Sequence, residues 1–367
     1  MQTKLIKTYQ ELRQFSDHWN PLLESSSANN LFLTWEWIDA WLNSNPHNTL
    51  YVVTVYSDNH ELIGIAPFYI GQCRLLEIVQ QRTLRMIGDT ESAAEYPSII
   101  ARSECEQLVC RAITARLKAD RKHWDTIWLP RCASWDPNIN TFTKALADTG
   151  GIGCYTRRVA FSAFELPATY DDYLAEFSRN RRNSLRRIEK KVESIGNLEI
   201  HTCQTQSEVE KYLSALYRLH QKRWMEKGES GSFANRPALR RFYAQFVPRA
   251  LHNGWLRFTM LTHKAEPKAI QIGYCYNGSY HQIQEGFDPE FHENVGNYLR
   301  IKTIRNFIDE GIKCYDFLGG ESEHKRRWKA VVRDGFDLFA WNHKLKNLPF
   351  SYKPIWPTGR FLKQVLP

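Results

Sequence analysis

The segment HQIQEGFDPEFHENVGNYLR, residues 281–300, changes from a strand pattern to a helix pattern within a few residues. Its first part, residues 281–288, alternates as a strand does, and the helix that follows runs to Gly311. Gly296 stands where that helix begins. It is either an ordinary loop residue or a position where backbone N–H groups approach a phosphate at the helix N-terminus.

The size and composition of the chain limit what it can be. With 367 residues, 43% of them hydrophobic, we expect two domains or one large duplicated domain rather than a disordered chain. The net charge of +9 favours anionic partners such as nucleotide phosphates, nucleic acid, membrane surfaces or acidic glycans. The eight cysteines have neither disulfide-framework nor zinc-ligand spacing, so we expect reduced thiols and no metal.

The chain has no segment of about 20 apolar residues, which a membrane helix requires, and its N-terminus has no apolar leader. We therefore expect a cytoplasmic protein without a membrane span.

Two stretches of the chain repeat the same order of predicted elements: helix, hairpin, strand, helix, strand. The first begins with the helix FLTWEWIDAWLNS (residues 32–44) and ends with the strand DTIWLP (residues 125–130). The second follows two longer helices and ends with CYDFLGG (residues 314–320). This internal similarity predicts a duplicated α/β architecture.

Between the repeats lies a strongly basic helix, DDYLAEFSRNRRNSLRRIEKKVESIG, residues 171–196. Its apolar residues recur at helical spacing, but Arg181 falls where that stripe expects a hydrophobic residue. Two interpretations are open. The arginines are a solvated face, or one or more of Arg181, Arg182 and Arg186 bind a phosphate or carboxylate of the substrate.

Candidate catalytic residues lie on the strands of the second repeat. Strict alternation places His281 and Glu285 on one face and Gln284, a candidate substrate ligand, on the other. Apolar neighbours would raise the pKa of Glu285 and suit it to act as a general base, whereas a salt-bridged strand residue is the structural alternative. His281 is a second candidate base. Asp316 precedes the pair Gly319–Gly320, so it binds either backbone N–H groups of that turn or a substrate amine.

Lys325 and Trp328 lie one helical turn apart in HKRRW. They either close an acceptor pocket or simply begin a new helix.

Three segments together, SRNRRNSLRR, GFDPEFHENVGNYL and YDFLGGESEHKRRW, resemble the GNAT-fold acyltransferases of the cellulose-biosynthesis and biotin-operon types, relatives of the FemAB aminoacyltransferases. The resemblance covers about residues 32–328. In two places the chain departs from these relatives, since His324 stands where tyrosine is common and Arg181 where an aromatic residue is common.

The resemblance implies an α/β (α+β) fold of two tandem GNAT-like modules, each a mixed, mostly antiparallel sheet flanked by helices. We expect a degenerate N-terminal module in residues 1–165, an acyltransferase module in 166–345 that includes the basic helix 170–196, and an extended tail in 346–367. Acyl-CoA would enter between splayed strands, with its pyrophosphate at the helix that follows. The implied cofactor-binding residues are Val295, Gly296, Asn297, Tyr298 and Arg300.

The leading hypothesis is therefore an acyl-CoA-dependent N-acyltransferase, with acetyl-CoA as donor and an amine on a sugar, polysaccharide precursor or other small metabolite as acceptor. Because no covalent intermediate is needed, the reaction requires a neutral amine, an oxyanion donor and a proton for the thiolate. The alternatives are a FemAB-like transferase that uses aminoacyl-tRNA, and a non-catalytic basic binding module. We expect a monomer.

Overall fold

The computed structural model describes residues 1–75, 79–89, 92, 94–226, 228–229 and 231–343. The tail predicted for residues 346–367 lies outside the described residues. The described residues divide into two compact units, the first formed by Met1–Ala160 and residues 334–343, the second by Phe161–Arg333.

The first unit contains a mixed sheet with helices. Its elements are β1 (Gln2–Ile6), α1 (Tyr9–Arg13), α2 (Ser16–Glu24), η1 (Leu31–Leu33), α3 (Trp35–Ser44), β2 (Thr49–Tyr56), β3 (Leu62–Leu75), β4 (Val79–Met86), β5 (Ile100–Ala101), α4 (Glu106–Ala119), β6 (Thr126–Ala133), α5 (Pro137–Ala147), most of β7 (Ile152–Glu165) and most of β13 (Val331–Asn342). The strands follow the order β1-β2-β3-β4-β6-β13-β7, with β5 beside β3.

The second unit repeats this plan. Its elements are α6 (Tyr170–Ala175), α7 (Arg179–Glu193), β8 (Leu198–Thr202), η2 (Gln206–Glu208), α8 (Val209–Met225), α9 (Pro237–His252), β9 (Leu256–His263), β10 (Glu266–Tyr276), β11 (Ser279–Phe287), α10 (Val295–Asp309), β12 (Cys314–Gly319) and α11 (Glu323–Arg326). Its sheet order is β7-β12-β11-β10-β9-β8. The predicted α/β class with two similar modules is confirmed.

Two strands have residues in both units. Residues 335–341 of β13 pair with β6 of the first unit, whereas the last residues of β7 pair with β12 of the second. The last strand of the described residues therefore completes the sheet of the first unit. The sequence pattern predicts neither strand.

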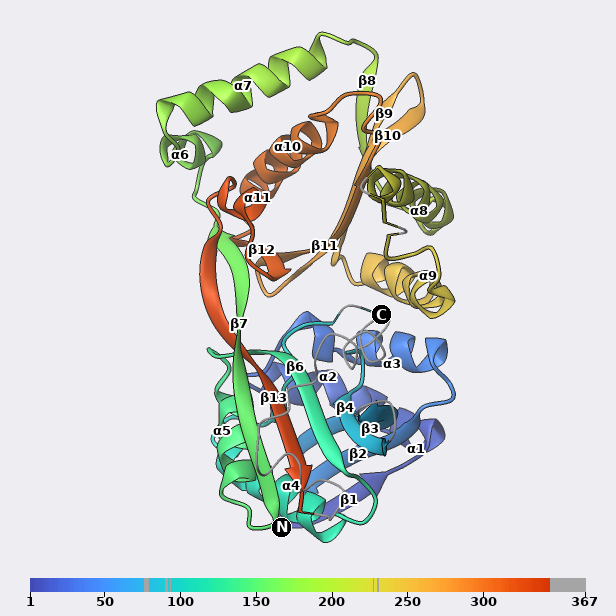
Figure 1. Cartoon of the computed structure of the whole chain (residues 1–367), viewed down its shortest axis with the longest axis vertical. Coiled ribbons are helices and arrows are strands. Elements are labelled where there is room, and N and C mark those ends of the chain that lie inside the picture. Colours follow the sequence, from blue (N-terminus) through green and yellow to red (C-terminus); the bar gives the residue numbers. More distant parts are fainter. Residues whose placement is uncertain (76–78, 90–91, 93, 227, 230, 344–367) are drawn as a thin grey trace. The chain divides into compact units, whose positions relative to one another are not determined.

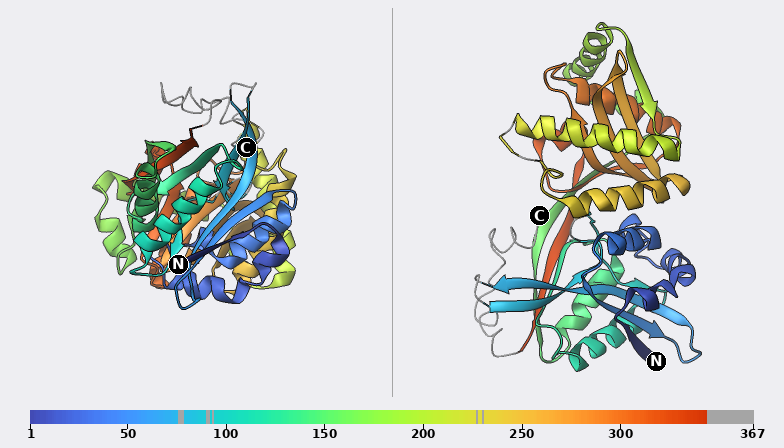
Figure 2. Two further views of the ribbon diagram at one scale, coloured as in Figure 1. Left: turned by 90° about the horizontal axis from the view of Figure 1, so that it is seen from below. Right: turned by 90° about the vertical axis from the view of Figure 1, so that its right-hand side faces the viewer.

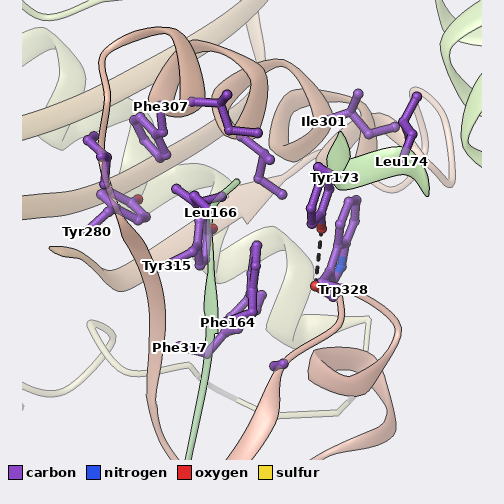
Figure 3. Close-up of a cluster of buried hydrophobic side chains, with 14 of the residues drawn as sticks. Phe164, Leu166, Tyr173, Leu174, Tyr280, Ile301, Phe307, Tyr315, Phe317 and Trp328 are labelled. Carbon is purple, nitrogen blue, oxygen red and sulfur yellow. Dashed lines mark hydrogen bonds between the residues drawn. The ribbon is translucent and has the colours of Figure 1, made fainter. Parts of the chain in front are cut away.

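Helix α10 is the central helix of the second unit. It packs on one face of the sheet, while α8 and α9 cover the other (Figure 1), as the right-hand view of Figure 2 also shows. Its apolar residues are distributed over two clusters: Ile301 and Phe307 join an aromatic core with Tyr315 (Figure 3), and Val295 and Tyr298 pack against Val192 of α7. Being apolar on more than one side, the helix is buried between the sheet and α7.

Among the helices that the described part of the chain forms, none is both long and apolar enough to cross a membrane.

Two glycines fix how β11 packs against its helices. A Cβ on Gly286 would lie 2.5 Å from the backbone nitrogen of His220 and 2.8 Å from the carbonyl carbon of Leu219, both in α8. A Cβ on Gly296 would lie 2.8 Å from Cδ1 of the Phe287 ring. Gly286 is thus confined by backbone, which does not yield, and Gly296 by a half-buried side chain, which does.

We predict that Gly286→Ala lowers the free energy of unfolding by about 3 kcal/mol, since overpacking against backbone forces α8 away from the sheet. Gly296→Ala should cost about 1 kcal/mol or less, because Phe287 rotates and alanine favours the helix. Chemical denaturation of both variants measures the difference. Equal costs would contradict this account of the packing.

Candidate active site

Strands β11 and β12 diverge beside the N-terminus of α10. They pair in parallel at Ser279–His281 and Cys314–Asp316 only, although β11 continues to Phe287. The edge of β11 from Gln282 to Phe287 is therefore not paired to β12, and the chain passes from this edge into α10. The splayed arrangement expected from the resemblance is present in the second unit.

A β-bulge at Ile283 decides which side chains share a face. On β10, Ile272 lies opposite Gln284 and the next residue, Gly273, lies opposite Gln282, so Ile283 is the extra residue. A bulge reverses the alternation beyond it. The prediction that His281 and Glu285 share a face was therefore wrong. His281 faces the α8 side with Gln284, and Glu285 faces the α10 side.

Glu285 is held by two arginines. Its carboxylate accepts hydrogen bonds from Arg300, from Nη1 of Arg223 at 2.8 Å and from Nε2 of Gln282 at 3.1 Å. Burial alone would raise the pKa of Glu285, but the charges of Arg300 and Arg223 outweigh it and lower that pKa to about 2. Of the two interpretations of Glu285, the salt-bridged strand residue is confirmed, and the raised pKa is wrong because the neighbours of this carboxylate are cations.

Arg300 links Glu285 to His324. Nη1 of Arg300 lies 2.7 Å from Nε2 of His324. Because a guanidinium only donates, Nε2 must accept, and the ring proton then resides on Nδ1. Burial and the charge of Arg300 lower the pKa of His324 to about 4, so the ring is neutral near pH 7. The residue is exposed, which leaves its Nδ1–H accessible to a ligand.

A polar network lies beneath this cluster. Tyr315 donates to Oε1 of Gln282 at 2.7 Å and accepts from Nε2 of Gln271 at 2.6 Å. The same Gln271 nitrogen reaches the hydroxyl of Tyr280 at 3.0 Å. Each of these amides is thus fixed in orientation, and Gln282 is held against Glu285.

His281 and Asp316 form a separate buried pair on the opposite face. Nδ1 of His281 lies 3.4 Å from Oδ2 of Asp316. Oδ1 of Asp316 accepts the backbone N–H of Leu318 at 2.7 Å, which agrees with the structural role considered for it, and Leu318 has a φ of 62°. A positive φ at a non-glycine residue is strained, so the carboxylate stabilises this turn.

The N-terminus of α10 is uncapped. The side chain of Asn294 makes no cap hydrogen bond, and the backbone N–H groups of Gly296 and Asn297 have no acceptor among the described residues. Gly296 also lies close to the ring of Phe287, a contact that the sequence did not indicate. Val295 and Tyr298 are buried in the core and Arg300 faces Glu285, so of the predicted set Gly296 and Asn297 present their backbone here.

The remaining predicted residues lie on α7 and around α11. Arg181 and Arg300 both lie against Trp328, with Cζ atoms 5.4 Å and 5.3 Å from the indole centroid. Arg182 donates to the carbonyl of Phe177 at 2.5 Å, and Arg186 is exposed. Nζ of Lys325 donates to four successive carbonyls at distances from 2.6 to 3.2 Å, those of Phe317, Leu318, Gly319 and Gly320.

Trp328 itself is fully buried, and its carbonyl accepts a hydrogen bond from the Tyr173 hydroxyl at 3.1 Å (Figure 3). Lys325 and Trp328 therefore hold the chain after β12 against the core. Trp328 contacts both Arg181 and Arg300, and Arg300 pairs with Glu285, so these side chains lie in one region.

Arg223 is the site residue that sequence reasoning missed. Its only signal is a cation late in an amphipathic helix, which many surface residues share.

Comparison with known proteins identifies the second unit. Residues 179–326 match the acetyltransferase (GNAT) domain family. No curated protein matches the chain significantly in sequence.

Several solved structures share the fold. FemX has a TM-score of 0.62 at 10% identity, covering 96% of this chain and all of that one. A protein of unknown function from Bacteroides thetaiotaomicron scores 0.55 at 12% identity, covering 89% and 97%. L-PGS from Bacillus licheniformis scores 0.53 at 14% identity, covering 90% and 94%. At these identities the likeness extends to the fold alone.

The pair Glu285–Arg300 should dominate the acid stability of the second unit. Since the pKa of Glu285 falls from its ordinary 4.5 to about 2 on folding, its stabilisation is full above pH 4.5 and is lost as the pH falls toward 2. At pH 7, Glu285→Gln leaves the buried Arg300 without its countercharge and should cost about 3–5 kcal/mol. Denaturation between pH 2 and 7 measures both effects.

Glu189→Gln is the matched control. Glu189 also accepts from two cations, Lys302 and Arg305, but their side chains are 21% and 38% exposed, whereas that of Arg300 is 2% exposed. This change should cost about 1 kcal/mol or less. If Glu285→Gln and Glu189→Gln lose equal stability, the buried Glu285–Arg300 pair contributes no more to stability than the more exposed pairs of Glu189.

Proposed function

We propose that the chain is an acyl-CoA-dependent N-acyltransferase, with acetyl-CoA as donor and an amine of a sugar, polysaccharide precursor or other small metabolite as acceptor. The observation that carries the proposal is the divergence of β11 from β12 directly before the uncapped N-terminus of α10. An extended donor fits along an unpaired strand edge, and the helix N-terminus offers N–H groups to its phosphates.

The residues that would hold the pyrophosphate are few. The N–H groups of Gly296 and Asn297 are available, and the first turn of α10 contains no acidic side chain. The positive end of the helix dipole lies at the same place. By contrast, the corresponding helix of the first unit, α4, carries Glu106 in its first turn, which would repel a phosphate. We therefore assign the donor to the second unit and a non-catalytic role to the first.

In the transfer, the amine nitrogen attacks the thioester carbonyl, the tetrahedral oxyanion collapses, and the C–S bond breaks to release a thiolate, which takes up a proton. With a pKa of about 2, Glu285 is a weak base near pH 7. Its role in this proposal is to orient Arg223 and Arg300. Their positive field favours the neutral form of a nearby acceptor amine, which is the form that reacts. The Nδ1–H of His324 is a candidate donor to the oxyanion.

A second candidate is transfer from an aminoacyl-tRNA. The observation that favours it is the outer face of α7, where five basic residues are exposed and form no ion pair with any described residue: Arg179, Arg186, Arg187, Lys190 and Lys191. Such a row suits a nucleic-acid backbone. FemX, whose name is associated with the FemAB relatives, shares the fold, but a likeness in fold does not identify the acyl donor.

We predict that acetyl-CoA binds the wild-type protein and that Asn297→Asp weakens its affinity at least about tenfold, because a carboxylate in the first turn of α10 repels the pyrophosphate. An acidic residue there also favours the helix, so the variant should remain folded. Titration calorimetry measures the affinity.

Asn306→Asp provides the matched control, since it places the same charge in the last turns of α10, about 13 Å away along the axis. If the wild type, Asn297→Asp and Asn306→Asp bind acetyl-CoA with equal affinity, its pyrophosphate does not bind at the N-terminus of α10. If millimolar acetyl-CoA does not bind while charged tRNA binds in a salt-sensitive manner, the second candidate replaces the first.

A further inference from the structure

The cluster around Glu285 carries more positive than negative charge. The cluster contains three guanidinium groups: those of Arg223 and Arg300 contact the single carboxylate, Glu285, and that of Arg181 lies against Trp328, as Arg300 does. Arg223 and Arg300 pair with Glu285, and Arg181 has no carboxylate partner in the described part of the chain. His324 is neutral near pH 7. The cluster thus lacks about two negative charges.

Arg181 is the cation with the least compensation. Its side chain is half-buried against the fully buried Trp328, and Arg327, a further cation, lies near it. Burial and the charge of Arg327 lower the pKa of Arg181. Removing a charge from water without a countercharge is costly. A ligand that supplies the countercharge would remove this cost.

Three hydrogen-bond donors in the cluster also have no acceptor among the described residues. The Nε atoms of Arg181, Arg223 and Arg300 are all buried, and none has an acceptor among the described residues. Buried N–H groups without acceptors are uncommon in native proteins. Those of Arg223 and Arg300 belong to groups already held by Glu285, whereas the guanidinium of Arg181 makes no hydrogen bond with a described residue and is partly accessible.

This anion site is distinct from the helix end assigned to the donor. Val192 of α7 packs against Val295 and Tyr298 at the start of α10. Arg181 lies eleven residues before Val192, about 16 Å away along α7. The pyrophosphate of the donor would therefore lie near Val192, and the ligand of Arg181 about three helical turns earlier along α7.

We infer that Arg181 binds an acidic group, a phosphate or a carboxylate, on the acceptor, so that the acceptor is an amine that also carries negative charge. This inference rests on the proposed N-acyltransferase function and narrows its acceptor class. A guanidinium stacked on an indole presents its N–H edges to a planar or tetrahedral oxyanion. The anion binds beside the amine site and away from Glu285.

The test measures anion binding without any donor. Thermal unfolding of the wild type is followed with inorganic phosphate and with acetate, each from 0 to 50 mM at constant ionic strength. A rise of about 4 °C is expected at tenfold excess over Kd for the anion that matches the acceptor. Arg181→Met should lose this response, and Arg187→Met, which removes an exposed arginine of the same helix, should keep it.

Two further variants remove ambiguity. Asn297→Asp must keep the response, since phosphate at the start of α10 would otherwise imitate it. Arg181→Gln repeats the test if the methionine variant does not fold. A response to phosphate identifies a phosphorylated acceptor and a response to acetate a carboxylate. No response in the wild type, or an equal response in Arg181→Met, overturns the inference.

Titration with acetyl-CoA separates the acceptor from the donor. If Arg181→Met binds acetyl-CoA as the wild type does, the anion belongs to the acceptor. A tenfold loss would assign Arg181 to the donor and overturn the inference. If the wild type does not bind acetyl-CoA, the proposed donor fails, whereas the anion response of Arg181 is still decided by the unfolding experiment.

Discussion

The ion pair between Glu285 and Arg300 is the interaction on which the rest of the site depends. It joins β11 to α10, and both side chains are largely withdrawn from water, with 17% and 2% exposed. The same arginine orients His324 and lies against Trp328 and Phe317. One buried cation therefore determines the ionisation of a carboxylate, the tautomer of a histidine and the position of an indole.

The bulge at Ile283 makes that pair possible. Without it, Glu285 would share a face with His281 and point toward α8, where Arg300 does not lie. Gly273, opposite the bulge, has no room for a Cβ, which would lie 2.3 Å from the carbonyl oxygen of His281 and 2.5 Å from the ring of Tyr280. The irregular strand that separates two polar clusters onto two faces thus requires a glycine on its neighbour.

Sequence reasoning succeeded where a feature is local. The order of elements, the helix after Asn294 and the binding of a turn N–H by Asp316 all follow from periodicity and turn chemistry. It failed where distant segments meet. Nothing near Glu285 in the sequence reveals Arg300 and Arg223, which reverse the expected pKa, and a single extra residue at Ile283 does not disturb a short alternating pattern. The pairing of β13 with β6 joins residues some 200 positions apart in the chain.

The excess positive charge of the cluster would allow an amine to react beside Glu285, although this carboxylate is a weak base. An amine reacts only after it loses a proton, and a carboxylate with a pKa of about 2 does little to remove one. In the proposed reaction, two guanidinium groups near the amine would achieve a similar end by disfavouring the ammonium form. That field would also repel a cationic acceptor on approach, unless a second charge on the acceptor is attracted elsewhere. Arg181 lies against Trp328 and forms no ion pair with Glu285, so an anion bound to Arg181 would anchor the acceptor without separating Arg223 or Arg300 from Glu285.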